Sequence, residues 1–225
     1  MRNPTRRNRN IGTAKQGHGQ NNALTLPRSG DKAYYEELMD PVAEKRTVNG
    51  HEFLFVTEKT KRSYRHACSV EEVCAVIMRI PDGDYCNMRF IVLRQPKRKE
   101  EILSAVWGRF VPKYAFGKET APAIIIEAVN CNKALKWPKK LSVEDKRELN
   151  RLAADGHAIT DDGRHFVIQS DPDSVRRTQL FRTIPHEFGH YVHFCMHSRA
   201  QWNSLPRVEK ERFADAYAER VMKTT

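Results

Sequence analysis

The sequence predicts an α+β fold in which a small mixed sheet packs against helices. Patterns typical of helices and of strands alternate along the chain, and capping or turn residues separate them. The 225 residues are 40% hydrophobic and 30% charged, and the mean hydropathy is -0.68. These values indicate a globular chain with a heavily charged surface, long enough to bury a sizeable core as one domain with a tail.

Residues 1–30 differ from the rest of the chain in charge and composition. They hold six lysines and arginines and no acidic residue, in a chain of net charge +11. Because large apolar residues are rare there, the stretch cannot bury enough surface to offset the entropy cost of ordering. We predict a disordered basic arm over residues 1–30 and a globular domain over residues 31–225. The basic arm favours weak contact with nucleic acid or another polyanion, or is only a solubilising tail.

Cysteine usage and apolar segments indicate a cytoplasmic protein without a membrane partner. The five cysteines are odd in number, widely spaced and without a C-x-x-C pair, which favours free thiols over a cysteine zinc site. The longest apolar stretch, residues 121–129, is interrupted by Pro122 and Glu127 and falls far short of the ~20 residues of a membrane span. No apolar segment follows the first arginines, as a secretory signal requires.

In the first part of the globular domain, turn and capping residues mark the element boundaries. Asn49-Gly50 is a turn signal that leads into a strand. Ser69 and Glu72 form a capping-box pattern, which predicts that a helix begins there. The elements predicted are a helix at 31–46, a strand at 51–59, a helix at 69–79, a strand at 85–95, a helix at 96–110 and a strand at 123–129.

The second part of the domain is predicted to contain three helices and a hairpin. Ser142 caps a charged helix, and Asp173 or Ser174 caps a long apolar one. Pro206 begins the last helix. The elements predicted are a helix at 142–156, a hairpin at 158–168 with its turn at 161–163, a helix at 178–197 and a helix from 206 to the end.

The most informative pattern is His186, Glu187 and His190 in an H-E-x-x-H arrangement. Histidines four residues apart on a helix lie one turn apart on the same face, so both imidazoles can reach one metal ion. Glu187 lies beside the pair, where it can take a proton from a water activated by the metal. A buried helix whose histidines only form hydrogen bonds is the alternative, but it leaves several polar rings on an apolar helix without partners.

Pro185 directly precedes the first histidine and lacks a backbone N–H. Either the helix of residues 178–197 kinks there, or Pro185 lies in the first turn of a helix that starts at Thr183 or Ile184. Both arrangements keep the two histidines on one face, so the proline does not conflict with a metal site.

A third ligand is expected from the last helix, which offers four acidic residues. Glu211 and Asp215 are four residues apart and share a face. We predict that Glu211 binds the metal and that a second acid accepts a hydrogen bond from a ligand histidine. Glu209 and Glu219 fit a solvated helix face. Small residues near these acids would let the last helix approach the motif helix closely: Ala214 and Ala218.

The motif followed about twenty residues later by E-x-x-x-D, here Glu211 to Asp215, resembles the gluzincin branch of zinc metallopeptidases. The run E-R-F-A-D-A-Y-A over residues 211–218 is similar to the E-x-x-A-N/D-x-F-A helix of the ImmA/IrrE-like metallopeptidases. The resemblance covers residues 175–222. It implies a zincin-like fold, in which the motif helix and a C-terminal ligand helix pack on the sheet, and a zinc ligand at Glu211.

These residues together predict a zinc metallopeptidase that acts on a protein or peptide. His186, His190 and Glu211 hold Zn²⁺ with one position open, and Glu187 is the general base for a water that the metal activates. An oxyanion-stabilising group is expected among the tyrosines and histidines, and the resemblance implies an edge strand for the substrate, for which residues 166–169 are proposed. The candidates for the oxyanion are Tyr191, Tyr217, His157 and His165.

Two other interpretations start from the same residues. The metzincin pattern would need Gly at position 193 and His at position 196, where this chain has His193 and Met196, so His193 and His197 are expected to be helix-end or supporting groups. A regulatory or nucleic-acid-binding module with a zincin fold and a structural or lost metal is the alternative function. Glu187 argues against it, because a structural metal site needs no general base.

Overall fold

The computed structural model describes residues 38–97 and 106–223. The chain separates into two units, Met1–Ala33 and Tyr34–Thr225, and all described residues belong to the second. The predicted basic arm therefore lies outside the described residues, as do residues 31–37 of the first predicted helix. Within the described part, no helix has the length and apolar character needed to cross a membrane.

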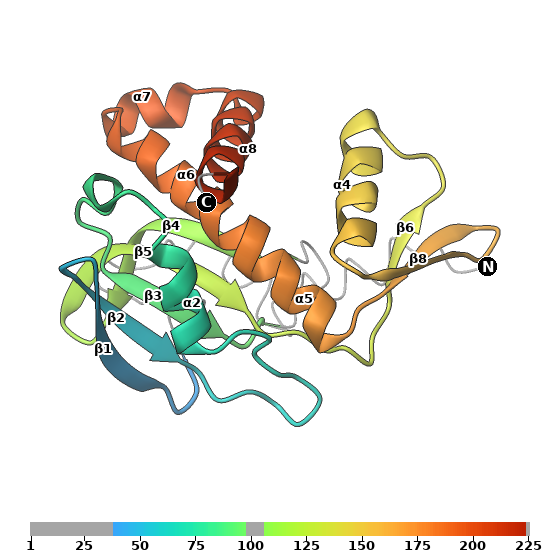
Figure 1. Cartoon of the computed structure of the whole chain (residues 1–225), viewed down its shortest axis with the longest axis horizontal. Helices are drawn as coiled ribbons and strands as arrows, with labels where there is room; N and C mark the ends of the chain where they lie inside the picture. Colours follow the sequence, from blue (N-terminus) through green and yellow to red (C-terminus); the bar gives the residue numbers. More distant parts are fainter. Residues whose placement is uncertain (1–37, 98–105, 224–225) are drawn as a thin grey trace, which may run out of the picture. The chain divides into compact units, whose positions relative to one another are not determined.

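A five-stranded mixed sheet forms the centre of this unit, with strand order β1-β2-β3-β5-β4 (Figure 1). The three inner strands are parallel, and the two outer strands, β1 and β4, are antiparallel to their neighbours. The helix α2 connects β2 to β3. The mixed α+β class predicted from the sequence is confirmed. The bounds are β1 Val42–Val48, β2 His51–Thr57, α2 Val70–Ile77, β3 Phe90–Arg94, β4 Gly108–Phe116 and β5 Glu119–Glu127.

The hairpin of β1 and β2 corrects the helix predicted at 31–46. Residues 42–46 are extended and pair with β2 over the whole of β1. Asn49 and Gly50 both have positive φ, 47° and 80°, as a two-residue hairpin turn requires, so the turn predicted there joins two strands and not a helix to a strand. The turn brings β2 back alongside β1. Pairing with β2 stabilises residues 42–46 as a strand, although their sequence pattern favours a helix.

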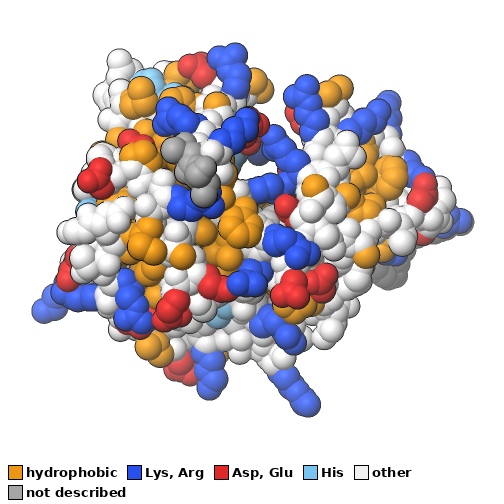
Figure 2. Space-filling model, viewed as in Figure 1, with side chains coloured by type: hydrophobic (Ala, Val, Ile, Leu, Met, Phe, Trp, Pro, Cys, Tyr) orange, Lys and Arg blue, Asp and Glu red, His pale blue; other side chains and the backbone are white. Residues whose placement is uncertain are grey.

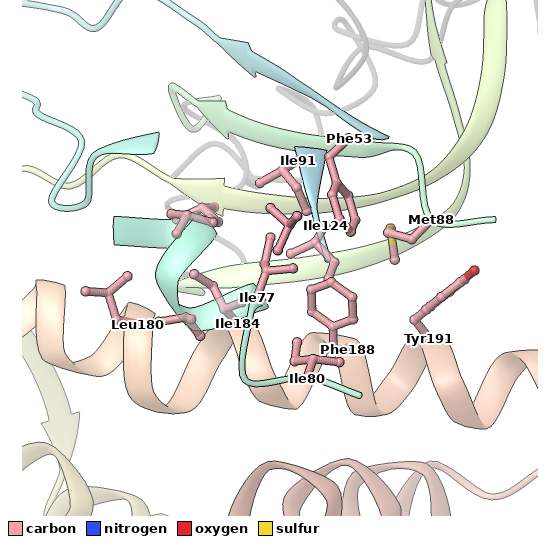
Figure 3. Close-up of a cluster of buried hydrophobic side chains, with 14 of the residues drawn as sticks. Phe53, Ile77, Ile80, Met88, Ile91, Ile124, Leu180, Ile184, Phe188 and Tyr191 are labelled. Atoms are coloured by element: carbon pink, nitrogen blue, oxygen red, sulfur yellow. The ribbon is translucent and has the colours of Figure 1, made fainter. Parts of the chain in front are cut away.

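Alternating side chains of the sheet bury both of its faces. One face carries Phe53, Ile91 and Ile124, which meet α2 and the motif helix in the main core (Figure 3). The opposite face carries a smaller apolar cluster that includes Phe90 and Ile125. The inner strands therefore read as continuous apolar runs, as expected for parallel strands covered on both sides.

The strand β4 corrects the helix predicted at 96–110. Residues 98–105 lie outside the described part, but Gly108–Phe116 is a strand at one edge of the sheet. Gly108 is closely enclosed, because a Cβ there would lie 2.7 Å from the Ile125 carbonyl oxygen and 2.7 Å from Thr183 Cγ2. This close packing brings the edge of the sheet directly against the start of the motif helix.

The sequence predicted one sheet, but the structure contains a second, three-stranded antiparallel sheet. Its order is β6-β8-β7. The hairpin predicted at 158–168 is confirmed, and so is the helix capped by Ser142, whose side chain accepts a hydrogen bond from Asp145 N. The bounds are β6 Leu135–Pro138, α4 Val143–Ala154, β7 Ala158–Asp161 and β8 His165–Gln169.

The motif helix is the last part of a longer helical segment that α5 begins. Asp171, not Asp173 or Ser174, caps α5. A π-helical stretch, η3, follows and leads directly into α6, where Pro185 lies in the first turn. Widening of the helix in η3 accommodates a proline that lacks an N–H and crowds the preceding turn. The bounds are α5 Pro172–Thr178, η3 Gln179–Thr183 and α6 Ile184–Cys195.

Two helices complete the unit, α7 Arg199–Ser204 and α8 Arg207–Lys223. The short α7 was not predicted, whereas α8 begins directly after Pro206 as expected. α8 packs along α6 on the side away from the five-stranded sheet (Figures 1 and 3). The motif helix is thus enclosed between the sheet and α8.

We predict that Val73→Ala in α2 lowers the free energy of unfolding by about 2 kcal/mol, because Val73 is fully buried in the main core and loses two methyl groups. Val208→Ala in α8 is the matched control, since Val208 is 78% exposed and its change should stay within about 0.5 kcal/mol. Urea denaturation of both variants provides the measurement, and equal midpoints would contradict the core described.

Candidate metal centre

Three side chains of the kind that bind zinc converge where α6 faces α8. Glu211 Oε2 lies 3.3 Å from His186 Nε2 and 3.6 Å from His190 Nε2. The two imidazole rings are 4.6 Å apart between centroids. One ligand atom from each of the three residues lies within 4.8 Å of the others. The structure therefore brings together the three residues that the sequence singled out.

Close packing of the two helices explains how Glu211 reaches the histidines. Gly189, between them on α6, faces Ala214, and a Cβ at position 189 would lie 2.8 Å from Ala214 Cα. The pair lets the helix backbones approach more closely than larger residues allow. The predicted role of Ala214 as a small residue at this contact is thus borne out by its position.

Asp215 orients one of the two histidines. Its Oδ1 lies 3.0 Å from His186 Nδ1, one helical turn from Glu211. A hydrogen bond from Nδ1–H to this carboxylate leaves Nε2, the nitrogen that faces Glu211, with its lone pair when the ring is neutral. On its other side, Asp215 Oδ2 lies 3.6 Å from Arg151 of α4.

The carboxylates of Glu211 and Asp215 stabilise a positive charge on His186, and the histidines stabilise the negative charges of the carboxylates. Burial disfavours the charged form of His186, but hydrogen bonds to Asp215 and Glu211 outweigh it and raise its pKa to about 9. Hydrogen bonds from His186 and His190 hold the pKa of Glu211 far below its usual range. A hydrogen bond from His186 also lowers the pKa of Asp215. The carboxylates thus favour positive charge at this point between α6 and α8.

Glu187 lies next to the three ligand-type residues but points to the sheet edge. It is only 9% exposed, and its Oε2 accepts a hydrogen bond of 2.7 Å from the Phe110 backbone N–H on β4. Burial raises the pKa of Glu187, against the opposing effect of His186 and His190. Burial and a raised pKa are features shared by many functional carboxylates, so Glu187 is a candidate functional residue beside the three ligand-type side chains.

A cleft of about 1200 Å³ gives access to the centre. The cleft is lined by β4 and η3 together with parts of β6, α4 and α8. Figure 2 shows a hollow in this region, with Lys and Arg side chains around it. Large apolar side chains line it beside charged ones, and Phe181 is 45% exposed. An ion pair between Arg182 of η3 and Glu148 of α4, with 2.6 Å between Nη2 and Oε1, connects two of its walls.

The two tyrosines proposed to stabilise an oxyanion do not lie at the centre. The Tyr191 hydroxyl donates to the Tyr85 carbonyl oxygen at 3.0 Å, and the Tyr217 hydroxyl donates to Asp84 Oδ2 at 2.8 Å. Both hydroxyls lie on the side of the helices that faces the loop before β3. Neither tyrosine lines the cleft.

The two histidines proposed for the same role are also held elsewhere. His157 is buried between the hydroxyls of Ser170 and Thr178, each 2.9 Å from one ring nitrogen. His165 lies in the hairpin, 3.7 Å from Asp162. None of the four residues proposed for the oxyanion therefore lines the cleft.

The prediction that residues 166–169 form an edge strand for the substrate is wrong. Residues 166–169 belong to β8, which is the central strand of the three-stranded sheet and pairs with β6 and β7. The strand beside Glu187 is β4, at the edge of the larger sheet. Its alternating Phe110, Tyr114 and Phe116, followed by the Gly117 turn, were the sequence signal that could have identified it.

His193 and His197 have the supporting contacts expected of them, and Glu209 and Glu219 lie on the solvated face of α8, as the sequence predicted. His193 stacks on Phe213 with ring centroids 4.2 Å apart. His197 Nδ1 lies 2.8 Å from the His193 carbonyl oxygen at the end of α6. Glu209 and Glu219 are exposed on α8.

No protein-family model, curated protein or solved structure matches this chain. The three ligand-type residues and Glu187 are therefore the features of this chain that indicate its function.

We predict that zinc binding releases about one proton per ion at pH 7.5, since His186 with a pKa of about 9 is protonated in the metal-free chain and must lose that proton. Zinc affinity should rise about tenfold per pH unit up to about pH 9 and then level off. Titration calorimetry in two buffers of different ionisation enthalpy measures the proton count. In Asp215→Asn the pH above which zinc affinity levels off should be lower, because His186 loses the carboxylate that raises its pKa. A zinc affinity independent of pH would contradict the contact between His186 and the two carboxylates.

We predict that Gly189→Ala lowers the free energy of unfolding by about 1–3 kcal/mol and weakens zinc binding, because the added Cβ separates α6 from α8 and so Glu211 from the histidines. Gly83→Ala is the control: nothing lies within 4 Å of its Cβ position. Thermal melts with and without zinc compare the two. Equal zinc-induced shifts in both variants would show that the helix contact does not set the ligand spacing.

Proposed function

We propose that this chain is a zinc metallopeptidase of the gluzincin type with a zincin-like fold, similar to the ImmA/IrrE-like enzymes. The observation that carries the proposal is the convergence of His186, His190 and Glu211 beside the buried carboxylate of Glu187. A structural metal site would need ligands but no such base.

The residues present fit a zinc ion. Two imidazole nitrogens and one carboxylate oxygen match a ligand set found in catalytic zinc sites, and such sites leave one position for water or substrate. His186 would bind through Nε2, because Nδ1 already faces Asp215. When bound, Zn²⁺ supplies Lewis acidity, which makes water acidic enough to act as a nucleophile near neutral pH.

Glu187 has the position and the proton affinity to move the proton of that reaction. Its raised pKa favours uptake of a proton from the attacking water, and the Phe110 N–H keeps the carboxylate directed at the sheet edge. The same carboxyl can then give the proton to the leaving amine.

The substrate we propose is an extended polypeptide that pairs with β4. This strand is at the edge of the sheet, and the resemblance to zincins implies such a strand for the substrate. Phe110 and Pro112 of β4 line the cleft. Across it, Trp137 and Phe181 offer apolar surface, so peptides with a large apolar side chain near the cleaved bond are the favoured class.

We predict that Glu187→Gln retains about one zinc per chain but loses hydrolysis by a factor of about 100 or more, because the amide accepts the Phe110 N–H bond but takes up no proton. Plasma mass spectrometry after dialysis gives the zinc content, and cleavage of unfolded casein gives the activity.

Two variants accompany this experiment. Glu211→Ala should lose zinc and activity together, and the exposed Glu209→Gln should retain both. Undiminished hydrolysis by Glu187→Gln would refute the assigned base. A wild-type chain that holds zinc yet cleaves nothing would favour the alternative of a binding module with a structural metal.

A further inference from the structure

Two of the five cysteines meet although they are far apart in the sequence. Cys195 is the last residue of α6, one helical turn after Tyr191, and its thiol lies near the Tyr191 hydroxyl and the Cys86 thiol. Cys86 lies in the loop that follows η2, Asp82–Asp84. Both cysteines are exposed and neither forms a disulfide. The proposed hydrolysis uses neither of them.

The backbone on both sides of Cys86 is fixed to α6. The Asn87 N–H donates to the Tyr191 hydroxyl at 2.8 Å, and that hydroxyl donates to the Tyr85 carbonyl oxygen at 3.0 Å. Tyr191 is fully buried and lies one helical turn before Cys195. The two thiols are therefore brought together by a buried anchor and not by two mobile surface side chains.

Cys86 itself has an unusual backbone conformation. Its φ is 42°, in the left-handed region that residues with a Cβ rarely adopt. Such a conformation persists only where the surroundings impose it, which here are the hydrogen bonds of its two neighbours to Tyr191. The position of the Cys86 backbone beside Tyr191 is thus fixed by the loop, and the Cys86 thiol itself donates to the Gly83 carbonyl oxygen at 3.6 Å.

The other three cysteines are less accessible to oxidants. Cys68 is buried, and burial raises the pKa of its thiol to about 12. Burial also raises the pKa of the thiols of Cys74 and Cys131, both of which are only partly exposed, and of Cys195 at the end of α6. Because the thiolate is the reactive form, Cys68, Cys74 and Cys131 should react slowly, and the exposed Cys86 rather than Cys195 should make the first attack.

We propose that Cys86 and Cys195 form a redox-modification site, a dithiol that a small disulfide oxidant such as oxidised glutathione converts into an intramolecular disulfide. The thiolate of exposed Cys86 attacks one sulfur of the oxidant, and a glutathione thiolate leaves. Cys195 then loses its proton and attacks the Cys86 sulfur of the mixed disulfide, which releases the second glutathione thiolate. Two protein thiols are oxidised, one glutathione disulfide is reduced, and both protons end on the two glutathiones.

This disulfide would join the end of the motif helix to the loop before β3. It closes a loop of about 110 residues, which restricts the unfolded chain and should raise the thermal midpoint by several degrees. The bond lies one turn beyond Tyr191 and involves no residue of the proposed metal centre, so zinc content should not change. In a reducing compartment such a bond forms only under oxidative conditions.

The test treats the reduced full-length chain with oxidised glutathione, blocks remaining thiols with iodoacetamide and maps the peptides by mass spectrometry. The expected result is one cross-linked peptide pair containing Cys86 and Cys195, two glutathiones released per chain, and alkylation of the other three cysteines. Glutathione adducts on Cys86 or Cys195 without a cross-link, or no preference over the other thiols, would overturn the proposal.

Single substitutions make the assignment specific. Cys86→Ser and Cys195→Ser should abolish both the cross-link and the rise in thermal midpoint, and both positions are exposed, so neither change disturbs the core. Cys131→Ser is the matched control and should form the cross-link as the wild type does. A cross-link that persists in Cys86→Ser through another cysteine would refute the pair.

Discussion

The close contact of α6 with α8 at Gly189 and Ala214 sets the distances on which the candidate centre depends. A histidine pair on one helix defines only a direction, whereas a three-residue site also needs an acid at the correct distance. Gly189 lets α8 come close enough for this distance, since a Cβ at position 189 would lie 2.8 Å from Ala214 Cα. Glu211 and Asp215, one turn apart on α8, then reach the histidines together.

A second set of contacts fixes the motif helix against the sheet. The Gln179 side chain of η3 donates to the Trp107 carbonyl oxygen at 3.1 Å and to the Glu127 carbonyl oxygen at 2.7 Å. The Glu127 carboxylate accepts from the fully buried Arg94 at 2.5 Å. These buried polar groups satisfy one another, which is the condition for their stability away from water. They hold the start of α6 beside β4, so that Glu187 meets the sheet edge.

One helix carries both proposed sites on different faces. His186 and His190 face α8, whereas Tyr191 faces the loop before β3 and positions Cys195 beside Cys86. The 3.6-residue period of the helix separates the two sets of side chains. A disulfide at the end of α6 would therefore restrict the helix without occupying the cleft, which makes the zinc and thiol experiments independent of each other.

The sequence by itself determined the features that depend on residues close together in the chain. These are the spacing of His186 and His190, the helix caps at Ser69 and Ser142, and the turn at Asn49, because each is formed within one or two turns of backbone. Only the tertiary structure decided that residues 42–46 and β4 are strands, since a strand is stabilised by its partner and not by its own pattern. It likewise decided the Phe110–Glu187 bond and the Cys86–Cys195 contact, which join residues 77 and more than 100 positions apart. Such contacts follow from helix packing and strand register, which no local pattern specifies.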